Sequence, residues 1–357
     1  MYASAQNGII RIDGENEWLS MNMDSDMIYY TLNGSTFRRT RMNDFLEMKH
    51  FNGNRYVRKL SCSESRDIAT AFYSTVNKMV NQFPFLKEHV RDYEFLKRRG
   101  KELMDIYQEK VPIVPPDRYH SLYIRISEGC PWNNCTFCNL YKNESYGIVK
   151  FDKLKEQAMA LKNYFRNSLD SMTGIFIGDA NSAGINSKIL QEYLEYINSE
   201  FNYPIYSFSD AFTTPKKKQD FEILKDLGMK RIYIGIESGN DKILKILNKN
   251  MDTGIAKKFI EEIKSSGINI GLIVMSGFGN EHVRDTVEFI ESIEYSKGDI
   301  IYISPVKEYN DFHGVMENNG IFITAENTIR EYNFIKSELK KKLNIPVVIY
   351  NVEESLY

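Results

Sequence analysis

Three of the four cysteines in this 357-residue chain fall within nine consecutive residues, at Cys130, Cys135 and Cys138. Thiolates at such close spacing suit a soft metal ion or a metal cluster, because one loop can turn its sulfurs toward a common centre. A zinc ribbon needs a fourth ligand, but Cys62 is far away and His120 lies at the other end of the preceding segment. This part of the sequence therefore offers three ligands, the three clustered cysteines. Iron–sulfur cubanes usually take four cysteines, so three would leave one iron open for another ligand.

The residues before the cysteines predict the element that carries them. Leu122, Ile124 and Ile126 alternate with more polar neighbours, a pattern that is typical of a short strand. Gly129 then allows the chain to turn into a loop. We therefore expect the three thiols just past the carboxyl end of a strand.

This stretch resembles the cluster loop of the radical S-adenosylmethionine (SAM) superfamily. Members of that superfamily hold a [4Fe-4S] cluster with three cysteines, and the amino and carboxylate groups of SAM occupy the remaining iron. The chain reads CxxxxCxxC, one residue longer in its first gap than the commonest superfamily spacing, and Phe137 fits the aromatic residue usually found before the last cysteine. The resemblance implies a [4Fe-4S] cluster on Cys130, Cys135 and Cys138, with SAM as a second cofactor and Phe137 as a cofactor-binding residue. Two alternatives stay open: three buried small apolar side chains, or a zinc knuckle.

Composition describes an ordinary globular protein, with 42% hydrophobic and 26% charged residues. No apolar run approaches the roughly 20 residues of a membrane span, and the N-terminus lacks the pattern of a secretory signal, so a cytoplasmic protein without a membrane partner is expected. Three clustered cysteines out of four give no disulfide framework. A net charge of -2 gives no global attraction to nucleic acid, although local patches leave such a partner open.

Beyond the cysteines, strand and helix patterns alternate. Strands are predicted at 173–178, 204–209, 231–236, 268–275 and 299–304. Helices are predicted at 151–165, 187–201, 216–227, 241–247, 254–266 and 283–295. Such alternation implies parallel strands with right-handed crossovers. With the strand at Leu122 the pattern predicts an α/β fold, a partial (β/α)6 barrel resembling a TIM barrel, which the superfamily resemblance also implies.

The flanks are predicted to form extensions of this barrel. We expect an N-terminal α+β extension over 1–117, the partial barrel over 118–305, and a C-terminal extension over 306–357 that closes the barrel. The first extension is predicted to contain strands at 8–13 and 27–32, a turn at 33–34, and helices at 63–81 and 86–108, the first with a capping box at Ser61 and Glu64. The last is predicted to contain a loop at 305–320, a helix at 329–342 and a strand at 347–352.

In parallel barrels, reactive groups gather at the carboxyl ends of the strands. Gly178 and Asp179 end the second strand, where the superfamily resemblance implies contact with the methionine amino group of SAM. Ser207 and Ser209 end the third strand and are candidate donors to SAM. The alternative for the first pair is a plain turn at the end of a strand.

The segment IGIESGNDKILKILNK resembles the superfamily more strongly, in particular the branch of oxygen-independent coproporphyrinogen oxidase. The resemblance implies that Glu237 contacts SAM, with Ser238 beside it, and that Lys249 pairs with the methionine carboxylate. A carboxylate suits ribose hydroxyls, which are hydrogen-bond donors. Met275, on the fifth strand, is a candidate wall of the adenine site. The alternatives are a structural carboxylate, a surface lysine and a core methionine.

The activity implied is reductive cleavage of SAM to a 5'-deoxyadenosyl radical, which removes hydrogen from a small polar substrate. An electron donor such as flavodoxin or ferredoxin is the expected partner. The basic segment 37–59, with Arg38 and Arg39, suits an anionic substrate group, or is simply a solvated face. The alternatives are modification of RNA or a peptide, and a non-enzymatic iron–sulfur or zinc module. Cys62 is either a packing residue or a hydrogen donor to a substrate radical.

Overall fold

The computed structural model describes residues 1–51, 54–213, 216–307, 312–351 and 357. These residues form two compact units. The first unit contains Met1–His120, Lys155–Thr173 and Tyr357, and the second contains Ser121–Leu154 and the described residues from Gly174 to Asn351. This division differs from the three expected segments, because 155–173 lies with the first unit and the C-terminal extension lies with the second.

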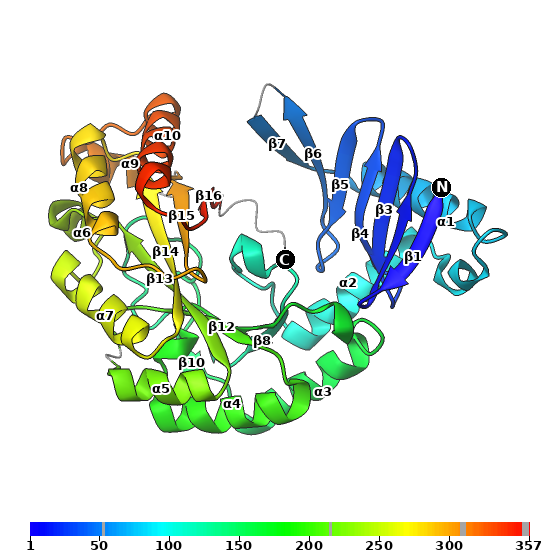
Figure 1. The fold of residues 1–357 in the computed structure, drawn as a ribbon, viewed down its shortest axis with the longest axis horizontal. Helices are drawn as coiled ribbons and strands as arrows, with labels where there is room; N and C mark the ends of the chain where they lie inside the picture. The colour runs from blue at the N-terminus through cyan, green and yellow to red at the C-terminus, as the bar shows by residue number, and fades with distance from the viewer. Residues whose placement is uncertain (52–53, 214–215, 308–311, 352–356) are drawn as a thin grey trace. The chain divides into compact units, whose positions relative to one another are not determined.

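The first unit is built on an antiparallel meander of seven strands, shown as the blue arrows in Figure 1. The strands are β1 (Tyr2–Gln6), β2 (Ile9–Asp13), β3 (Glu17–Asn22), β4 (Met27–Leu32), β5 (Ser35–Arg39), β6 (Phe45–Phe51) and β7 (Asn54–Lys59). Sequence reasoning predicted only the strands at 8–13 and 27–32. The turn at Asn33 and Gly34 is confirmed. Both residues have positive φ, 51° and 78°, as a tight hairpin between β4 and β5 requires.

Two helices pack their apolar faces into the core of this unit. They are α1 (Cys62–Lys78) and α2 (Tyr93–Tyr107). The predicted capping box is present, because Ser61 accepts a hydrogen bond from the backbone of Glu64, whose side chain accepts one from the backbone of Ser61. The predicted helix 86–108 is wrong in its first part. Pro84–His89 forms a 3-10 helix, and the Asp92 side chain caps a new helix at Tyr93.

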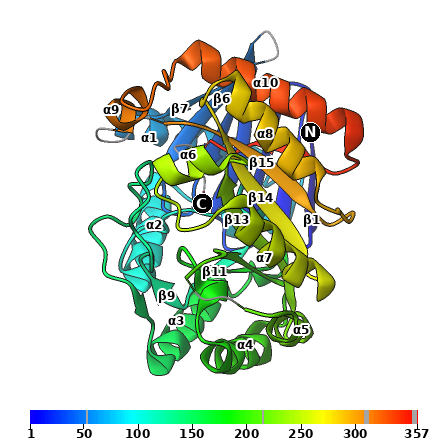
Figure 2. The same cartoon turned by 90° about the vertical axis from the view of Figure 1, so that its left-hand side faces the viewer.

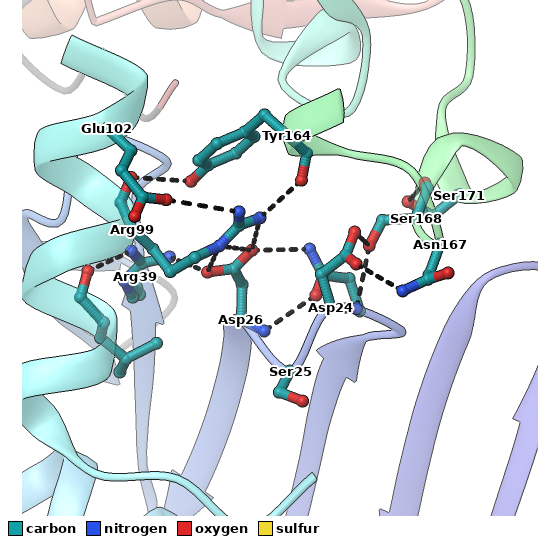
Figure 3. Close-up of polar contacts among 12 residues, drawn as sticks. Asp24, Ser25, Asp26, Arg39, Arg99, Glu102, Tyr164, Asn167, Ser168 and Ser171 are labelled. Atoms are coloured by element: carbon teal, nitrogen blue, oxygen red, sulfur yellow. Dashed lines mark hydrogen bonds and ion pairs between the residues drawn. The ribbon is translucent and has the colours of Figure 1, made fainter. Parts of the chain in front are cut away.

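A buried ion cluster ties the pieces of the first unit together (Figure 3). The Asp26 carboxylate accepts a hydrogen bond from Arg99 Nη2 at 2.8 Å, and it lies 3.5 Å from Arg39 Nη1. Arg99 also stacks on the ring of Tyr164, with its Cζ 3.5 Å from the ring centroid, and donates to the Tyr164 carbonyl. Ser168 Oγ donates to Asp24. The segment 155–173 therefore belongs to this unit through charge and hydrogen bonding.

We expect Asp26→Asn to destabilise the protein by about 3–5 kcal/mol at neutral pH, because it leaves buried guanidinium groups without their counter-charge. Burial alone would raise the pKa of Asp26, but Arg39 and Arg99 outweigh it and hold the pKa below its usual range. A lowered folded-state pKa contributes stability above the unfolded value of about 3.9, and that stability is lost as the pH falls through the folded value. Urea unfolding from pH 7 downward should therefore show the gap between wild type and variant closing only below about pH 4.

Asp44→Asn is the matched control for this prediction. Its carboxylate lies 2.7 Å from Lys59 Nζ, but the Asp44 side chain is partly exposed, at 35%, and that of Lys59 is 59% exposed. Exposed ion pairs contribute about 0–1 kcal/mol. Equal losses of stability in the Asp26 and Asp44 variants would contradict the assignment of Asp26 as the centre of the cluster.

The second unit is organised by a sheet of seven parallel strands in the order β16-β15-β14-β13-β12-β11-β8. The strands are β8 (Leu122–Arg125), β11 (Ile175–Gly178), β12 (Ile205–Ser209), β13 (Met229–Glu237), β14 (Asn269–Ser276), β15 (Ile300–Pro305) and β16 (Val347–Ile349). The six predicted barrel strands are confirmed, and so is the α/β partial-barrel fold. The predicted last strand adds a seventh, although residue 352 lies outside the described residues.

Helices connect these strands, and Figure 2 views the face of the sheet that α7 and α8 cover. The helices are α3 (Phe151–Tyr164), α4 (Ser187–Phe201), α5 (Lys218–Asp226), α6 (Asp241–Ile246), α7 (Thr253–Ser265), α8 (Asn280–Glu291), α9 (Phe312–Glu317) and α10 (Ala325–Lys342). The predicted loop at 305–320 is wrong in that α9 forms within it. None of the described helices is both long and apolar enough to cross a membrane.

Candidate active site

The cysteine loop leaves the carboxyl end of the first parallel strand, as predicted. A short antiparallel pair, β9 (Ser127–Glu128) with β10 (Gly147–Ile148), closes the loop at its base. Gly129 begins it with a φ of 67°, and a Cβ there would lie 3.0 Å from the Ser145 carbonyl oxygen. The turn into the loop therefore requires glycine.

The three thiols are partly buried and electrostatically coupled. Burial raises the pKa of Cys135 to about 11, with Glu237 and the other two thiols adding to the effect and Lys249 opposing it. Burial also raises the pKa of Cys138. Buried thiols of this kind become thiolates when a metal centre replaces the lost solvation. The donor set, three soft sulfurs on one loop, fits an iron–sulfur cluster with one iron left for SAM.

The three thiols do not converge on a position for a single metal ion. Among the residues that the structure describes, the same holds for every other group of three histidine, cysteine, aspartate or glutamate side chains.

Hydrogen bonds fix the cysteine loop to the end of α6, next to Lys249. Trp132 Nε1 donates to the Asn248 carbonyl at 2.8 Å, and Asn248 Nδ2 donates back to the Asn134 carbonyl at 2.8 Å. The backbone N–H of Thr136 donates to the Leu247 carbonyl at 3.1 Å. These contacts hold the thiol-bearing loop in one position relative to the fourth strand and its helix.

Phe137 anchors the same loop by packing. Its ring lies 6.5 Å from that of Phe312, centroid to centroid, and contacts the apolar cluster that contains Met275 and Met316. Phe137 and Met275, which sequence reasoning placed near SAM, thus share one apolar cluster. Their contact with SAM stays a prediction.

Glu237 and Lys249, which sequence reasoning paired with SAM, lie against each other. Lys249 Nζ is 3.1 Å from Glu237 Oε1, and the two side chains are about 10% exposed. Burial would lower the pKa of Lys249, but the charges of Glu237 and Cys135 outweigh it and raise the pKa. Glu237 has a φ of 64° where the register of β13 shifts, and a Cβ on Gly235 would lie 2.4 Å from Glu237 Oε1. The strand end therefore turns a carboxylate toward a buried ammonium beside a cluster thiol.

Asp179 supports the base of the cysteine loop. Its buried carboxylate receives hydrogen bonds from the Tyr123 hydroxyl, from Arg125 Nε at 3.3 Å and from the Gly129 backbone at 3.2 Å. Burial raises the pKa of Asp179, and Arg125 opposes that shift. A Cβ on Gly178 would lie 1.9 Å from the Tyr123 hydroxyl oxygen. In the structure, Gly178 and Asp179 therefore position the base of the cysteine loop. Their contact with SAM stays a prediction.

The three predicted serines also make internal hydrogen bonds. Ser207 Oγ is fully buried and donates to the Phe208 carbonyl at 3.0 Å. Ser209 Oγ donates to Asn181 Oδ1 at 3.1 Å, and Ser238 Oγ accepts from the Asn240 backbone at 3.1 Å. Strand-end position alone cannot show this use of the hydroxyls, so their role toward SAM remains a prediction.

Sequence reasoning missed two polar groups at the same edge of the sheet. Asn181 Nδ2 donates to Asp210 Oδ2 at 2.9 Å, and so links the ends of the second and third strands. The buried carboxylate of Glu331, from α10, accepts the backbone N–H groups of Gly277, Phe278 and Gly279. Asn181 could have been predicted, because it follows the end of a predicted strand. Glu331 could not, because α10 is distant in the sequence and no local pattern links it to this edge of the sheet.

Comparisons with known proteins bear on this site. The family model described as "Radical SAM superfamily" matches residues 124–290. Ribosomal protein uS12 methylthiotransferase RimO from Pelodictyon phaeoclathratiforme is 22% identical over 271 residues, which cover 71% of this chain and 60% of that protein. Heme chaperone HemW from Buchnera aphidicola is 25% identical over 244 residues, which cover 63% of each chain. The chain thus spans less than two thirds of the length of these relatives.

Two solved structures are also similar. Streptococcus suis SuiB matches with a TM-score of 0.47 and 15% identity, over 90% of this chain and 72% of that one. Coproporphyrinogen III oxidase from Escherichia coli matches with a TM-score of 0.46 and 12% identity, over 67% of this chain and 61% of that one.

Proposed function

Because the chain belongs to the radical SAM superfamily of enzymes, we propose that it cleaves SAM reductively at a [4Fe-4S] cluster held by Cys130, Cys135 and Cys138. The observation that carries the proposal is that the loop with the three thiols is hydrogen-bonded to Leu247 and Asn248, directly before Lys249 of the buried Glu237–Lys249 pair. Sulfur ligands suit the cluster, and a buried ammonium next to them suits the carboxylate of an amino acid.

When bound, the reduced cluster supplies the electron that splits SAM into methionine and the 5'-deoxyadenosyl radical. The residues of the chain orient and enclose the reactants. Lys249 is the proposed partner of the methionine carboxylate, and Glu237 is the proposed acceptor for the ribose hydroxyls. Asp179 accepts a hydrogen bond from the Gly129 backbone and so fixes the start of the cysteine loop. The rings of Trp132 and Phe212 pack edge to face, 5.7 Å between centroids, and provide an apolar cover near Lys249. Excluding water in this way protects a reactive radical.

The proposed substrate is a small polar molecule, and a flavodoxin or ferredoxin is the proposed electron donor. The expected exposed basic face is wrong at Arg38 and Arg39, because both side chains are buried and Arg39 is engaged with Asp26. They line a cavity of about 50 Å³ in the first unit, together with Arg41. That volume holds a few water molecules or one small anionic group.

Anaerobic reconstitution tests the proposed function. We expect about four irons and four sulfides per chain, the content of one [4Fe-4S] cluster, and release of 5'-deoxyadenosine from SAM when dithionite is added. A protein that binds a single zinc and releases no 5'-deoxyadenosine would instead support a non-enzymatic binding module. The two outcomes are separated by metal analysis and by chromatography of the nucleoside product.

A further inference from the structure

The cavity of about 50 Å³ in the first unit is lined by three arginines from one short stretch of the chain. Arg38 and Arg39 end β5, and Arg41 follows two residues later. Of the described residues that line this cavity, Asp26 alone carries a carboxylate. All of them belong to the first unit. The lining therefore carries more positive than negative charge, and such a cavity attracts anions.

Asp26 and Arg39 are already engaged within the protein (Figure 3). The Asp26 carboxylate also pairs with Arg99, so it has no charge left to neutralise a further cation. Arg39 donates in addition to Asn43 Oδ1 at 2.8 Å and to the Leu96 carbonyl at 2.9 Å. Three other polar side chains of the lining also donate internally, namely Asn22 to Asp26, Tyr164 to the Arg99 carbonyl and Ser171 to the Ser168 carbonyl. These groups build the walls of the cavity.

Arg41 differs from Arg39, because its charge has no counterpart nearby. Among the residues that the structure describes, no carboxylate lies within ion-pair distance of it. Its Nη2 donates to Met172 Sδ at 3.2 Å, and its Cζ lies 4.8 Å from the centroid of the Phe165 ring. A thioether is a weak acceptor, whereas a guanidinium carries several N–H donors. Most of the hydrogen-bonding capacity of Arg41 is therefore open to a ligand.

His120 adds a second donor to the lining. Its ring lies 6.4 Å from that of Tyr29, centroid to centroid, and neither ring nitrogen has a hydrogen-bond partner among the described residues. Burial, Arg38 and Arg41 lower the pKa of His120 to about 4. The ring is thus neutral at pH 7 and presents one N–H. Arg38 lies over the rings of Tyr29 and Tyr119, with its Cζ 5.3 and 4.9 Å from their centroids, so its guanidinium is held in place.

We propose that this cavity binds one oxyanion, a carboxylate or a phosphate group, through the Arg41 guanidinium, with Arg38 adding positive charge and the His120 ring a further donor. Guanidinium groups bind both kinds of oxyanion through paired N–H···O bonds. The cavity volume limits the ligand to one such group. The site needs neither the cluster nor SAM, so the inference goes beyond the proposed function.

Titration of the full chain with acetate and with inorganic phosphate, at constant ionic strength in chloride, tests the site. The signal is the nuclear magnetic resonance of the His120 ring in protein labelled with 13C-histidine. His120 is one of five histidines, and His120→Gln identifies its resonance. We expect a saturable shift with at least one of the two anions. Saturation by acetate alone would identify a carboxylate site, and saturation by phosphate alone a phosphate site.

Arg41→Met should weaken this binding at least about tenfold, because hydrogen bonds to charged groups are the strong ones. Arg11→Met is the matched control, since Arg11 is exposed on β2 and its loss removes the same charge from the same unit. Its affinity for the anion should equal that of the wild type. Equal affinities in the Arg41→Met protein and the wild type would overturn the inference.

The wild-type titration decides the matter if Arg41→Met does not fold. A His120 resonance that shows no saturable shift with either anion would mean that the cavity holds only water, and the inference would fall. Arg41→Lys gives a second variant, because it keeps the charge and loses the paired N–H geometry, so its affinity should lie between those of the wild type and Arg41→Met. A chain that assembles no cluster would contradict the proposed function and leave this titration unchanged, so the two failures are distinguishable.

Discussion

Replacing any one of Cys130, Cys135 and Cys138 with Ala is expected to remove most of the cluster iron and to abolish reductive cleavage of SAM. Each thiol is proposed to ligate a different iron, so two remaining ligands leave a second iron without a protein ligand. Residues that act as one unit are strongly non-additive, so the triple replacement should be scarcely worse than any single one. The measurement is iron and sulfide per chain together with 5'-deoxyadenosine released under dithionite.

The fold of these variants should persist, because the loop is held by other groups. Trp132 and Thr136 bind the backbone at the end of α6 through atoms that the replacements do not touch. Cys62→Ala is the control, since that thiol is exposed at the start of α1 in the first unit. It should keep full iron content, and unchanged product formation would also remove Cys62 as a hydrogen donor. A Cys135→Ala protein that keeps its cluster and its activity would contradict the cluster assignment.

The parts of this protein that could be predicted from sequence are those with local signals. The six barrel strands could be predicted because apolar strands alternate with amphipathic helices in the sequence. Each type of element has its own hydrophobic periodicity, so it can be recognised without knowing its partners. The three cysteines share one loop, so no long-range information was needed to bring them together. Glu237 and Lys249 are separated by a short helix, and their order after the cysteines placed both at the same edge of the sheet.

The first unit was predicted less completely than the barrel, because its interacting residues are far apart in the sequence. The sequence suggested that Arg39 is an exposed cation within a basic segment. In the structure it forms a buried ion pair with Asp26, which lies 13 residues before it. Arg99 reaches the same carboxylate across 73 residues. Most strands of the meander are short, and one face of β1 and β2 is solvated. Such strands carry little pattern before their partners are known.

Side-chain direction at strand ends was also beyond sequence reasoning. Ser207 was expected at the end of its strand, as Glu237 is, but it lies in the middle of β12, turns into the core and donates to backbone carbonyls. The register shift in β13, with positive φ at Glu237, turns that carboxylate toward Lys249 instead. A one-residue shift reverses which face a side chain takes, and nothing in the sequence around Gly235 specifies it uniquely.

Lys249→Met is expected to weaken SAM binding by about 2–5 kcal/mol, the usual loss when one partner of a buried charge pair is truncated. That corresponds to at least about thirtyfold in the dissociation constant. Two effects combine, because the variant lacks the ammonium proposed to bind the methionine carboxylate and leaves Glu237 buried without its counter-charge. The raised pKa of Lys249 keeps the ammonium charged at neutral pH. The loss should therefore be constant between about pH 6 and pH 9, since no proton leaves this group in that range.

A second buried pair in the same unit separates a binding role from a structural one. Lys264 Nζ lies 2.5 Å from the fully buried Asp299 carboxylate. Lys264→Met should destabilise the fold by a similar mechanism, yet leave SAM affinity in the reconstituted protein unchanged. Glu237→Gln adds a graded test, because it retains the ammonium of Lys249 and removes only the charge proposed to accept the ribose hydroxyls. Its loss of affinity should be smaller than that of Lys249→Met. If Lys264→Met weakened SAM binding as much as Lys249→Met, the effect would be one of stability, and Lys249 would no longer be assigned to the SAM carboxylate.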